Sequence, residues 1–599
     1  MKTLAIVLGI LFSATLQPQI IHAVRANPKT IMVPDDYSTI QEAIDAASDG
    51  DTIFVKSGTY YGHVIIDKSL TLVGQNRNTT ILDGNGTRTV VNVKANSVSI
   101  NGFLIRNSGF RGINIDSFDL CTISNNILAN TSGGIRAASS SNNIIRNNII
   151  GRMQASSIGG TGIALCVSSA YNIIPSTNNT ISNNTICSYR SGIGFHYSNN
   201  STIQGNTIIN NGDGMCIYGS GNTVISENII TNSTCRAIHL HVSDNGVVSC
   251  NNITDNGYGI VVDQSKSNII MQNKFTNNTY GIRMERSSNN LLRNNSFNNR
   301  YNFGVFGWKL SHFIHDIDSS NTVNGKPIYY LTDQHNLVVD SSTFPEIGYL
   351  AVVHSKKITV EGLRLMNNSQ GVLFAFTTNS IIKDVKVSEN YYGIQLVDSD
   401  NNTLRDLEVS GSFFGILMLD CDNNTLRENI VKNNEYGIYI TTRNTSSNNT
   451  ITRNNIKNNY LGLWLMGANN SIYHNNFINN TQQVEVKIRG KPCGHGAYNW
   501  TNIWDDGYPS GGNYWSDYNG TDLYRGPKQD QLGSDGIGDT PYIIIKNNRD
   551  NYPYMRPISV EVPPLWIQGW FWAIIISVIV VLAVLVYSVR AKKDLKVQK

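Results

Sequence analysis

The sequence predicts an all-β protein, a single long parallel β-helix in which three short strands form each coil of about 22 residues. A Gly-Ile motif marks the repeat. Apolar residues alternate after each marker, as Ile260 and Val262 do, which indicates strands with one buried face. Asn pairs separate the strands, and Asn tolerates left-handed turns and forms amide ladders when stacked. The markers lie 22 or 23 residues apart at Gly192, Gly214, Ala237, Gly259, Gly281 and Gly304.

The same markers continue toward the C-terminus. The interval from Gly304 to Gly371 equals three steps of the repeat, and Lys326 and Gly348 fall on these steps. Later markers are Gly393, Gly415, Gly437 and Gly462. We therefore expect one unbroken β-helix over residues 52–480. Leucine-rich repeats have a similar period, but their Leu-x-x-Leu-x-Leu framework is missing.

The N-terminal part divides into two segments. Residues 1–26 have a basic start, an apolar run and small residues near Ala23, which is typical of a secretory signal peptide. Residues 27–51 are expected to form a cap. Ile40, Ala43, Ile44 and Ala47 have helical spacing, which predicts an amphipathic helix over residues 38–48 that covers the first coil.

The C-terminal part predicts a membrane anchor. Residues 570–589 contain no charged residue, and about 20 apolar residues cross a bilayer as a helix. A short Pro-rich stalk, 557–569, precedes this segment, and a basic tail, 590–599, follows it. The positive-inside rule predicts a single-pass protein with its large N-terminal part outside the cytoplasm. The net charge of +4 on 599 residues argues against a nucleic-acid partner.

Residues 481–556 depart from the repeat and are rich in Trp, Tyr, Gly and Asp. One interpretation is an aromatic cap that closes the last coil. The alternative is a calcium site at Asp530, Asp535 and Asp539, because spaced carboxylates bind hard cations.

Several segments resemble known families. The Gly-Ile and Asn-Asn units are similar to the coils of the pectin-lyase-like superfamily, which implies right-handed coiling. The stretches "HDIDSSNTVNGKPIYYL" and "WDDGYPSGGNYWSDYNG" resemble the NosD-like group of archaeal surface proteins. Members of that group assist the maturation of a copper enzyme, so the resemblance implies copper as a cofactor.

The catalytic motifs of related enzymes are missing. The chain lacks the Asn-Thr-Asp of polygalacturonases, the Arg-x-Pro-x-x-Arg of pectate lyases and the pectin methylesterase set. A Gly-His-Gly occurs only beyond the regular coils, at residues 494–496. These departures favour a protein without enzymatic activity.

One outward-facing cluster is the candidate site. Residues two and four positions after each marker face solvent, and neighbouring coils lie about 4.8 Å apart. Thiolate and imidazole groups suit copper or zinc, although an exposed thiol outside the cell also forms disulfides. The expected metal ligands are Cys216, His239, His241 and His196. The polar stripe beside them, a candidate ligand-binding surface, contains Tyr218, Asp263, Arg283 and Glu285.

Three functions remain open. The first is a cell-surface protein whose β-helix binds glycans or envelope proteins without catalysis. The second is a copper-binding accessory protein. The third is a polysaccharide lyase, hydrolase or epimerase.

Overall fold

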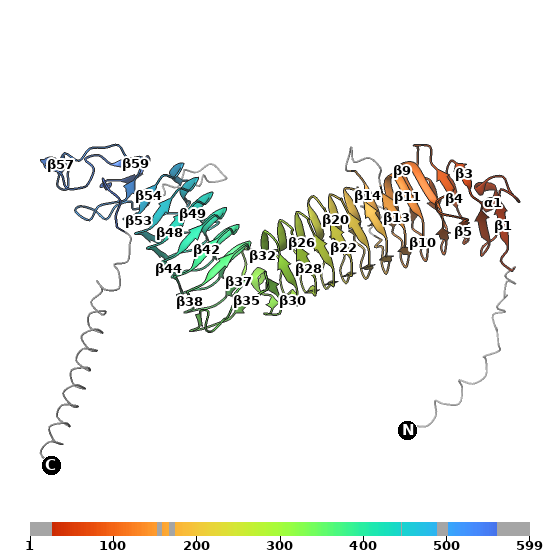
Figure 1. The fold of residues 1–599 in the computed structure, drawn as a ribbon, viewed down its shortest axis with the longest axis horizontal. Helices are drawn as coiled ribbons and strands as arrows, with labels where there is room; N and C mark the ends of the chain where they lie inside the picture. The colour runs from red at the N-terminus through yellow and green to blue at the C-terminus, as the bar shows by residue number, and fades with distance from the viewer. Residues whose placement is uncertain (1–26, 152–158, 167–173, 445, 488–500, 560–599) are drawn as a thin grey trace, which may run out of the picture. The chain divides into compact units, whose positions relative to one another are not determined.

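The computed structural model describes residues 27–151, 159–166, 174–444, 446–487 and 501–559 (Figure 1). These residues form two compact units, divided between Asn211 and Gly212. The signal peptide, the apolar segment 570–589, the basic tail and most of the stalk lie outside the described residues. Within the described residues, no helix is long and apolar enough to cross a membrane.

The first unit has the expected helix directly after its first strand, and the helix is shorter than predicted. Helix α1 (Ile40–Ala46) buries Ile40, Ala43 and Ile44. Its N-terminus carries a capping box, because Thr39 accepts from the Glu42 amide while Glu42 accepts from the Thr39 amide. The helix packs on three strands, β1 (Thr30–Val33), β2 (Thr52–Val55) and β4 (Val64–Ile66).

Parallel strands stack in register through the rest of the first unit. One column is β1, β2, β5 (Thr71–Gly74), β8 (Ser99–Asn101), β10 (Thr122–Ser124), β12 (Ile144–Arg146), β15 (Thr180–Ser182) and β18 (Thr202–Gln204). The other strands are β3 (Gly58–Tyr61), β6 (Thr80–Asp83), β7 (Val91–Val93), β9 (Leu104–Asp116), β11 (Ile127–Ala138), β13 (Ile149–Gly151), β14 (Thr161–Cys166), β16 (Thr185–Cys187), β17 (Ser191–His196) and β19 (Thr207–Ile209). The core is an aligned stack of aliphatic side chains, for example Ile100, Ile123, Ile145, Ile181 and Ile203.

The Asn pairs divide two tasks between them. In the pair Asn147-Asn148, the first residue has the left-handed φ of 57°. The second is buried, and its Nδ2 donates to Oδ1 of Asn184 in the next coil at 3.0 Å. Asn184 then donates to Asn206 at 3.0 Å. The predicted amide ladder is confirmed.

The second unit starts with a stack of the same type. Its first column is β20 (Asp213–Tyr218), β23 (Arg236–His241), β26 (Tyr258–Asp263), β29 (Tyr280–Glu285) and β32 (Tyr301–Phe306). The second column is β21 (Val224–Ser226), β24 (Val247–Ser249), β27 (Ile269–Met271), β30 (Leu291–Arg293) and β33 (Asp316–Ile317). The third column is β22 (Ile229–Thr231), β25 (Asn252–Thr254), β28 (Lys274–Thr276), β31 (Ser296–Asn298) and β34 (Thr322–Val323). Tyr258 pairs with Tyr280 and Ile260 with Ile282, so Gly259 and Gly281 are neighbours across coils, as predicted.

The winding is interrupted after β34. Asn324 and Gly325 have φ of 51° and 79°, the signature of a tight hairpin turn, and β35 (Lys326–Thr332) pairs antiparallel with β34. A short 3-10 helix, η1 (Leu310–Phe313), precedes this turn, between β32 and β33. The expected continuation of the marker column from Gly304 to Lys326 is therefore wrong at this step. The physical reason is the Asn-Gly turn, which reverses the chain.

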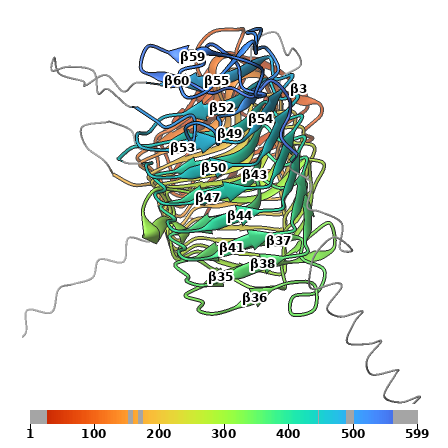
Figure 2. The ribbon, with the colours of Figure 1, turned by 90° about the vertical axis from the view of Figure 1, so that its left-hand side faces the viewer.

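A second stack begins at β35, and Figure 2 shows one of its columns, from β36 to β53, side by side. Its first column is β35, β37 (Tyr349–Val353), β40 (Gln370–Ala375), β43 (Tyr392–Val397), β46 (Phe414–Leu419), β49 (Tyr436–Thr441), β52 (Leu461–Leu465) and β55 (Gln482–Val486). The second is β36 (Val338–Val339), β38 (Thr359–Glu361), β41 (Ile381–Lys383), β44 (Thr403–Arg405), β47 (Thr425–Arg427), β50 (Thr450–Thr452) and β53 (Ser471–Tyr473). The third is β39 (Arg364–Met366), β42 (Lys386–Ser388), β45 (Glu408–Ser410), β48 (Ile430–Lys432), β51 (Asn455–Lys457), β54 (Asn476–Ile478) and β56 (Tyr514–Trp515).

The C-terminal module continues the core of the second stack. Trp515 is buried between Phe477, at a ring distance of 4.4 Å, and Tyr542, at 4.3 Å. Asn548 and Asp550 end two Asn ladders, since they accept from the amides of Asn502 and Asn513. The short strands of the module are β57 (Tyr524–Arg525), β58 (Gln531–Leu532), β59 (Tyr542–Ile545) and β60 (Asn548–Asp550). These contacts favour the interpretation of residues 501–556 as an aromatic cap.

Candidate functional site

The candidate site lies on the outer face of three neighbouring strands of the second unit, β23, β26 and β29. The strand register places Cys216 beside His239 and Tyr218 beside His241. One coil further, His241 is beside Asp263. Asp263 in turn is beside Glu285, and Val261 beside Arg283. Strand register and coil stacking thus bring these residues side by side in one stripe.

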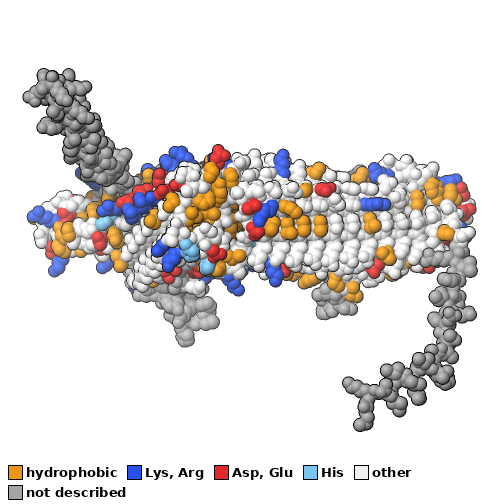
Figure 3. Space-filling view, turned by 90° about the horizontal axis from the view of Figure 1, so that it is seen from below, with side chains coloured by type: hydrophobic (Ala, Val, Ile, Leu, Met, Phe, Trp, Pro, Cys, Tyr) orange, Lys and Arg blue, Asp and Glu red, His pale blue; other side chains and the backbone are white. Residues whose placement is uncertain are grey.

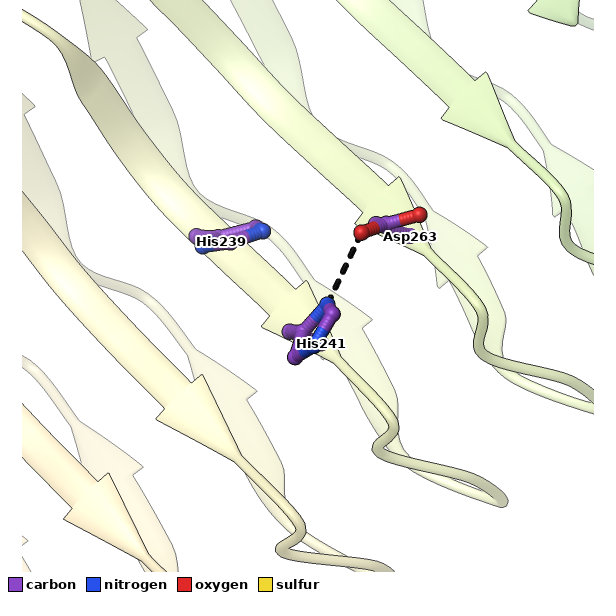
Figure 4. Close-up of side chains that lie close together, drawn as sticks. All are labelled: His239, His241 and Asp263. Atoms are coloured by element: carbon purple, nitrogen blue, oxygen red, sulfur yellow. Dashed lines mark hydrogen bonds and ion pairs between the residues drawn. The ribbon is translucent and has the colours of Figure 1, made fainter. Parts of the chain in front are cut away.

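Asp263 bonds both to His241, as Figure 4 shows, and to Arg286. Its Oδ2 lies 2.8 Å from Nδ1 of His241, and its Oδ1 accepts from Nη2 of Arg286 at 2.7 Å. Because an ionised carboxylate only accepts, Nδ1 of His241 donates in this bond. In a neutral His241 the lone pair is then on Nε2. A carboxylate that orients an imidazole in this way is a common arrangement behind metal ligands.

His239 has a different environment. Its Nδ1 lies 3.0 Å from Nη1 of Arg236, and Asp213 holds the same guanidinium through two bonds of 2.9 and 3.1 Å. A guanidinium only donates, so Nδ1 of His239 accepts and the imidazole is neutral. Burial, followed by the charge of Arg236, lowers the pKa of His239 to about 4. His239 therefore remains uncharged across the physiological pH range.

Three ligand atoms converge at this point. One atom each from His239, His241 and Asp263 lie within 4.8 Å of one another, and no other group of three His, Cys, Asp or Glu residues does so in the part of the chain that the structure describes. The group differs from the expected one by containing Asp263. Cys216 is half-buried beside His239 but outside the group, and His196 is an exposed residue of the first unit.

An open groove of about 570 Å³ surrounds the cluster. The rings of Tyr258 and Tyr280 stack along one wall, 4.5 Å apart, and Tyr391 meets Tyr280 edge-on at 6.2 Å. The lining residues are Cys235, Arg236, His239, His241, Tyr258, Val261, Asp263, Tyr280, Arg283, Glu285 and Tyr391. Imidazoles, carboxylates, guanidinium groups and phenol hydroxyls thus face one space, and Figure 3 shows that acidic and basic side chains form small groups on an otherwise largely uncharged surface.

Sequence reasoning missed four important residues of this groove. Arg236, Tyr258 and Tyr280 each stand immediately before a marker, and the repeated Tyr-Gly-Ile motif was the available signal for the two tyrosines. Tyr391 had no such signal. It comes from the second stack and reaches Tyr280 only because the chain reverses at Asn324-Gly325.

The other candidate cation ligands do not form a cluster. The carboxylate of Asp539 accepts from the amides of Leu523 and Tyr524, and that of Asp535 accepts from the amide of Ile537. These bonds hold turns of the C-terminal module. Asp530, Asp535 and Asp539 are not brought together as metal ligands.

Comparisons with known proteins agree with the sequence resemblance. A family model described as "Periplasmic copper-binding protein (NosD)" matches residues 166–309 and 314–520, more than half of the chain. A cell surface glycoprotein of Methanothermus fervidus is 36% identical over 107 residues. That alignment covers 18% of this chain and only 18% of the relative.

Solved structures of low identity are also similar. The tailspike protein of Escherichia coli bacteriophage HK620 is 13% identical, with a TM-score of 0.38, over 61% of this chain and 74% of its own. An exopolygalacturonase of Thermotoga maritima is 10% identical, with a TM-score of 0.35, over 44% of this chain and 91% of its own. Pectate lyase Pel9A is 12% identical, with a TM-score of 0.34, over 51% of this chain and 82% of its own.

Proposed function

The chain belongs to the NosD family, whose name describes periplasmic copper-binding proteins, and from this premise we propose that it is an extracytoplasmic, non-catalytic binding protein of the cell surface. Its ligand is a carbohydrate, held in the groove over β23, β26 and β29. The apolar segment 570–589 is proposed to anchor it in the membrane.

The observation that supports a carbohydrate ligand is the composition of the groove. Stacked tyrosines offer an apolar wall with hydroxyl groups at its edge, and a ligand site combines such apolar surface with a few convergent polar groups. Most charges are neutralised within the protein: Arg236 pairs with Asp213, and Arg286 with Asp263. A neutral, polyhydroxylated ligand matches this surface better than a highly charged one.

Glycan-array binding by the full chain tests the proposal, followed by calorimetry with the best-binding sugar. Tyr258→Ala should weaken binding by about tenfold, the upper range for loss of one aromatic contact. Tyr460→Ala is the matched control, because Tyr460 is 55% exposed and outside the groove. If no glycan binds, or if both variants bind as the parent does, the carbohydrate proposal is wrong.

Copper is the second candidate ligand, favoured by the convergence of His239, His241 and Asp263. Two imidazoles and a carboxylate suit divalent copper better than monovalent copper, which prefers sulfur ligands. His241 fits this role as placed, because Asp263 orients it and leaves Nε2 for a metal. His239 fits only if its bond to Arg236 is released, since the accepting Nδ1 implies a proton on Nε2.

Copper titration of the full chain tests this candidate directly. His239→Ala with His241→Ala should abolish binding, whereas His354→Ala should leave it unchanged, because His354 is exposed and far from the groove in sequence. Equal copper binding by the parent and the double variant contradicts the copper proposal while leaving the carbohydrate proposal open.

A further inference from the structure

The reversal at Asn324-Gly325 leaves the second stack incomplete at its start. The first coil of this stack supplies β35 to one column and β36 to the next. It supplies no strand to the third column, which begins one coil later with β39. Residues 340–347 occupy this part of the coil as turns, with Asp340 accepting from Ser342 and Thr343. One rung of the third column is therefore missing.

Strand β39 consequently has an open edge. In every later coil, the first residue of the strand donates its backbone N–H to the preceding coil: Lys386 to Leu363 at 2.9 Å, Glu408 to Val385 at 3.0 Å, and Ile430 to Leu407 at 2.8 Å. Arg364 occupies the same position in β39. Among the described residues β39 pairs only with β42, so the Arg364 N–H faces a place where no strand lies.

The Asn ladder that begins with Asn368, directly after β39, also lacks a member at its start. Along each ladder, Oδ1 of an Asn accepts from the coil before it, as Asn390 accepts from the Asn368 N–H at 2.9 Å. Asn368 is the first member of its ladder and is fully buried, yet its Oδ1 has no hydrogen-bond partner. Its Nδ2 donates to the carbonyl of Gly348, which lines the space beside β39. Buried acceptors without donors are rare in native proteins.

A groove of about 510 Å³ lies along this edge. Leu365 and Val387 contribute apolar surface, and Lys326 and Arg364 are exposed cations at its rim. Neither cation makes an ion pair with any described residue, whereas Lys386 is paired with Glu408. The groove thus combines an open strand edge with an unbalanced positive charge. Its lining is Val323, Asn324, Lys326, Ile347, Gly348, Arg364, Leu365, Met366, Lys386, Val387, Ser388, Glu408 and Ser410.

We propose that this groove is a docking site in which an extended acidic segment of a partner protein adds to β39 as the missing rung. Each strand of the column from β39 to β54 has three residues, and three extended residues span about 10 Å. The main chain of the segment accepts the hydrogen bond of the Arg364 N–H, and its acidic side chains pair with Lys326 and Arg364. Strand addition of this kind gives affinity through the main chain and specificity through alternate side chains.

The test uses the full chain and a fluorescein-labelled peptide, acetyl-Glu-Val-Glu-Val-Glu-amide, in a fluorescence anisotropy titration. Binding is expected together with slower hydrogen exchange at the Arg364 amide. A peptide with lysine in place of glutamate should not bind. A peptide with N-methylated valines, which cannot form the strand ladder, should not bind either. Binding of the N-methylated peptide with equal affinity overturns strand addition.

Charged side chains also protect exposed strand edges against aggregation without binding a partner. Two variants therefore test whether Lys326 and Arg364 bind the acidic peptide or only protect the edge of β39. Lys326→Glu with Arg364→Glu should weaken peptide binding by about tenfold or more, since two attractions become repulsions. The control is Lys274→Glu, because Lys274 is an exposed residue of β28 outside the groove; this variant should bind the peptide as the parent does. The proposal fails if the acidic peptide does not bind at 1 mM, if both variants bind it equally, or if a galacturonate oligomer binds there without protecting the Arg364 amide.

Discussion

The Asn ladders should carry a large share of the stability of each coil, and Asn273→Ala isolates one rung. Asn273 is 1% exposed. Its Oδ1 accepts from the Asn251 N–H at 3.0 Å and from Asn251 Nδ2 at 2.9 Å. Its Nδ2 donates to the carbonyls of Val248, at 2.8 Å, and Met271, at 3.1 Å. Alanine at this position removes all of these bonds at once.

The expected loss of stability follows from the hydrogen-bonding groups that Asn273→Ala leaves without partners. The Asn251 N–H becomes a buried donor without an acceptor, which costs about 1–3 kcal/mol, and each of the other lost bonds costs about 0.5–1.5 kcal/mol. The coil should therefore lose roughly 4 kcal/mol of local stability. The control is Asn252→Ala, because Asn252 is exposed on the neighbouring coil and its replacement should change stability by less than about 0.5 kcal/mol.

Native-state hydrogen exchange is the suitable measurement, since a solenoid need not unfold in one step. Amides of β24 and β27 should exchange about a thousandfold faster in Asn273→Ala, the equivalent of roughly 4 kcal/mol. Asn252→Ala should leave them unchanged. If the two variants behave alike, or if Asn273→Ala accelerates exchange by less than about tenfold, the ladder does not have the energetic role that its geometry indicates.

Three further outcomes are expected. Burial raises the pKa of Asp550 to about 7, above its ordinary value near 3.9, so the C-terminal module should lose stability as pH rises from about 4 to 7. Hydrogen exchange should show that Asp550→Asn reduces this pH dependence. An unchanged pH dependence contradicts the raised pKa of Asp550. If copper binds, the difference in copper affinity between the parent and His239→Ala should stay constant from pH 7 to about pH 5, because burial and Arg236 lower the pKa of His239 to about 4. If this difference disappears near pH 6.5 in the copper titration, the prediction is wrong. Protease added to intact cells should remove residues 27–565 and spare a tag at Lys599, and loss of the tag reverses the proposed orientation.

The periodic features of the fold were predictable from the sequence. The marker spacing gave the register that brings Gly259 beside Gly281. The Asn-Gly pair at 324–325 is a strong hairpin signal, but the 22-residue step at Lys326 and Gly348 predicts a continuous repeat across it. A local turn therefore overrode a period that continued on both sides of it.

The candidate site was predictable only as far as strand alternation reaches. Alternation identifies the outward face of His239, His241 and Asp263. It does not identify which of these side chains bond to one another. The choice of Asp263 over Cys216 depends on side-chain rotamers, and the contribution of Tyr391 depends on a tertiary contact more than 100 residues away in sequence.

The direction of the Asn ladders has a consequence for how the chain is made. In the second stack each coil donates its Asn N–H to the coil that follows, as Asn475 donates to Asn513, and two of its ladders end at Asn548 and Asp550. While the chain emerges from the ribosome or crosses the membrane, the Asn N–H of the last coil to appear has no acceptor until the next coil appears. A chain that stops within the second stack, before residue 548, leaves buried Asn N–H groups such as those of Asn502 and Asn513 without these acceptors. A chain truncated within the second stack therefore keeps buried donors without acceptors, a structural difference that quality-control proteases can recognise.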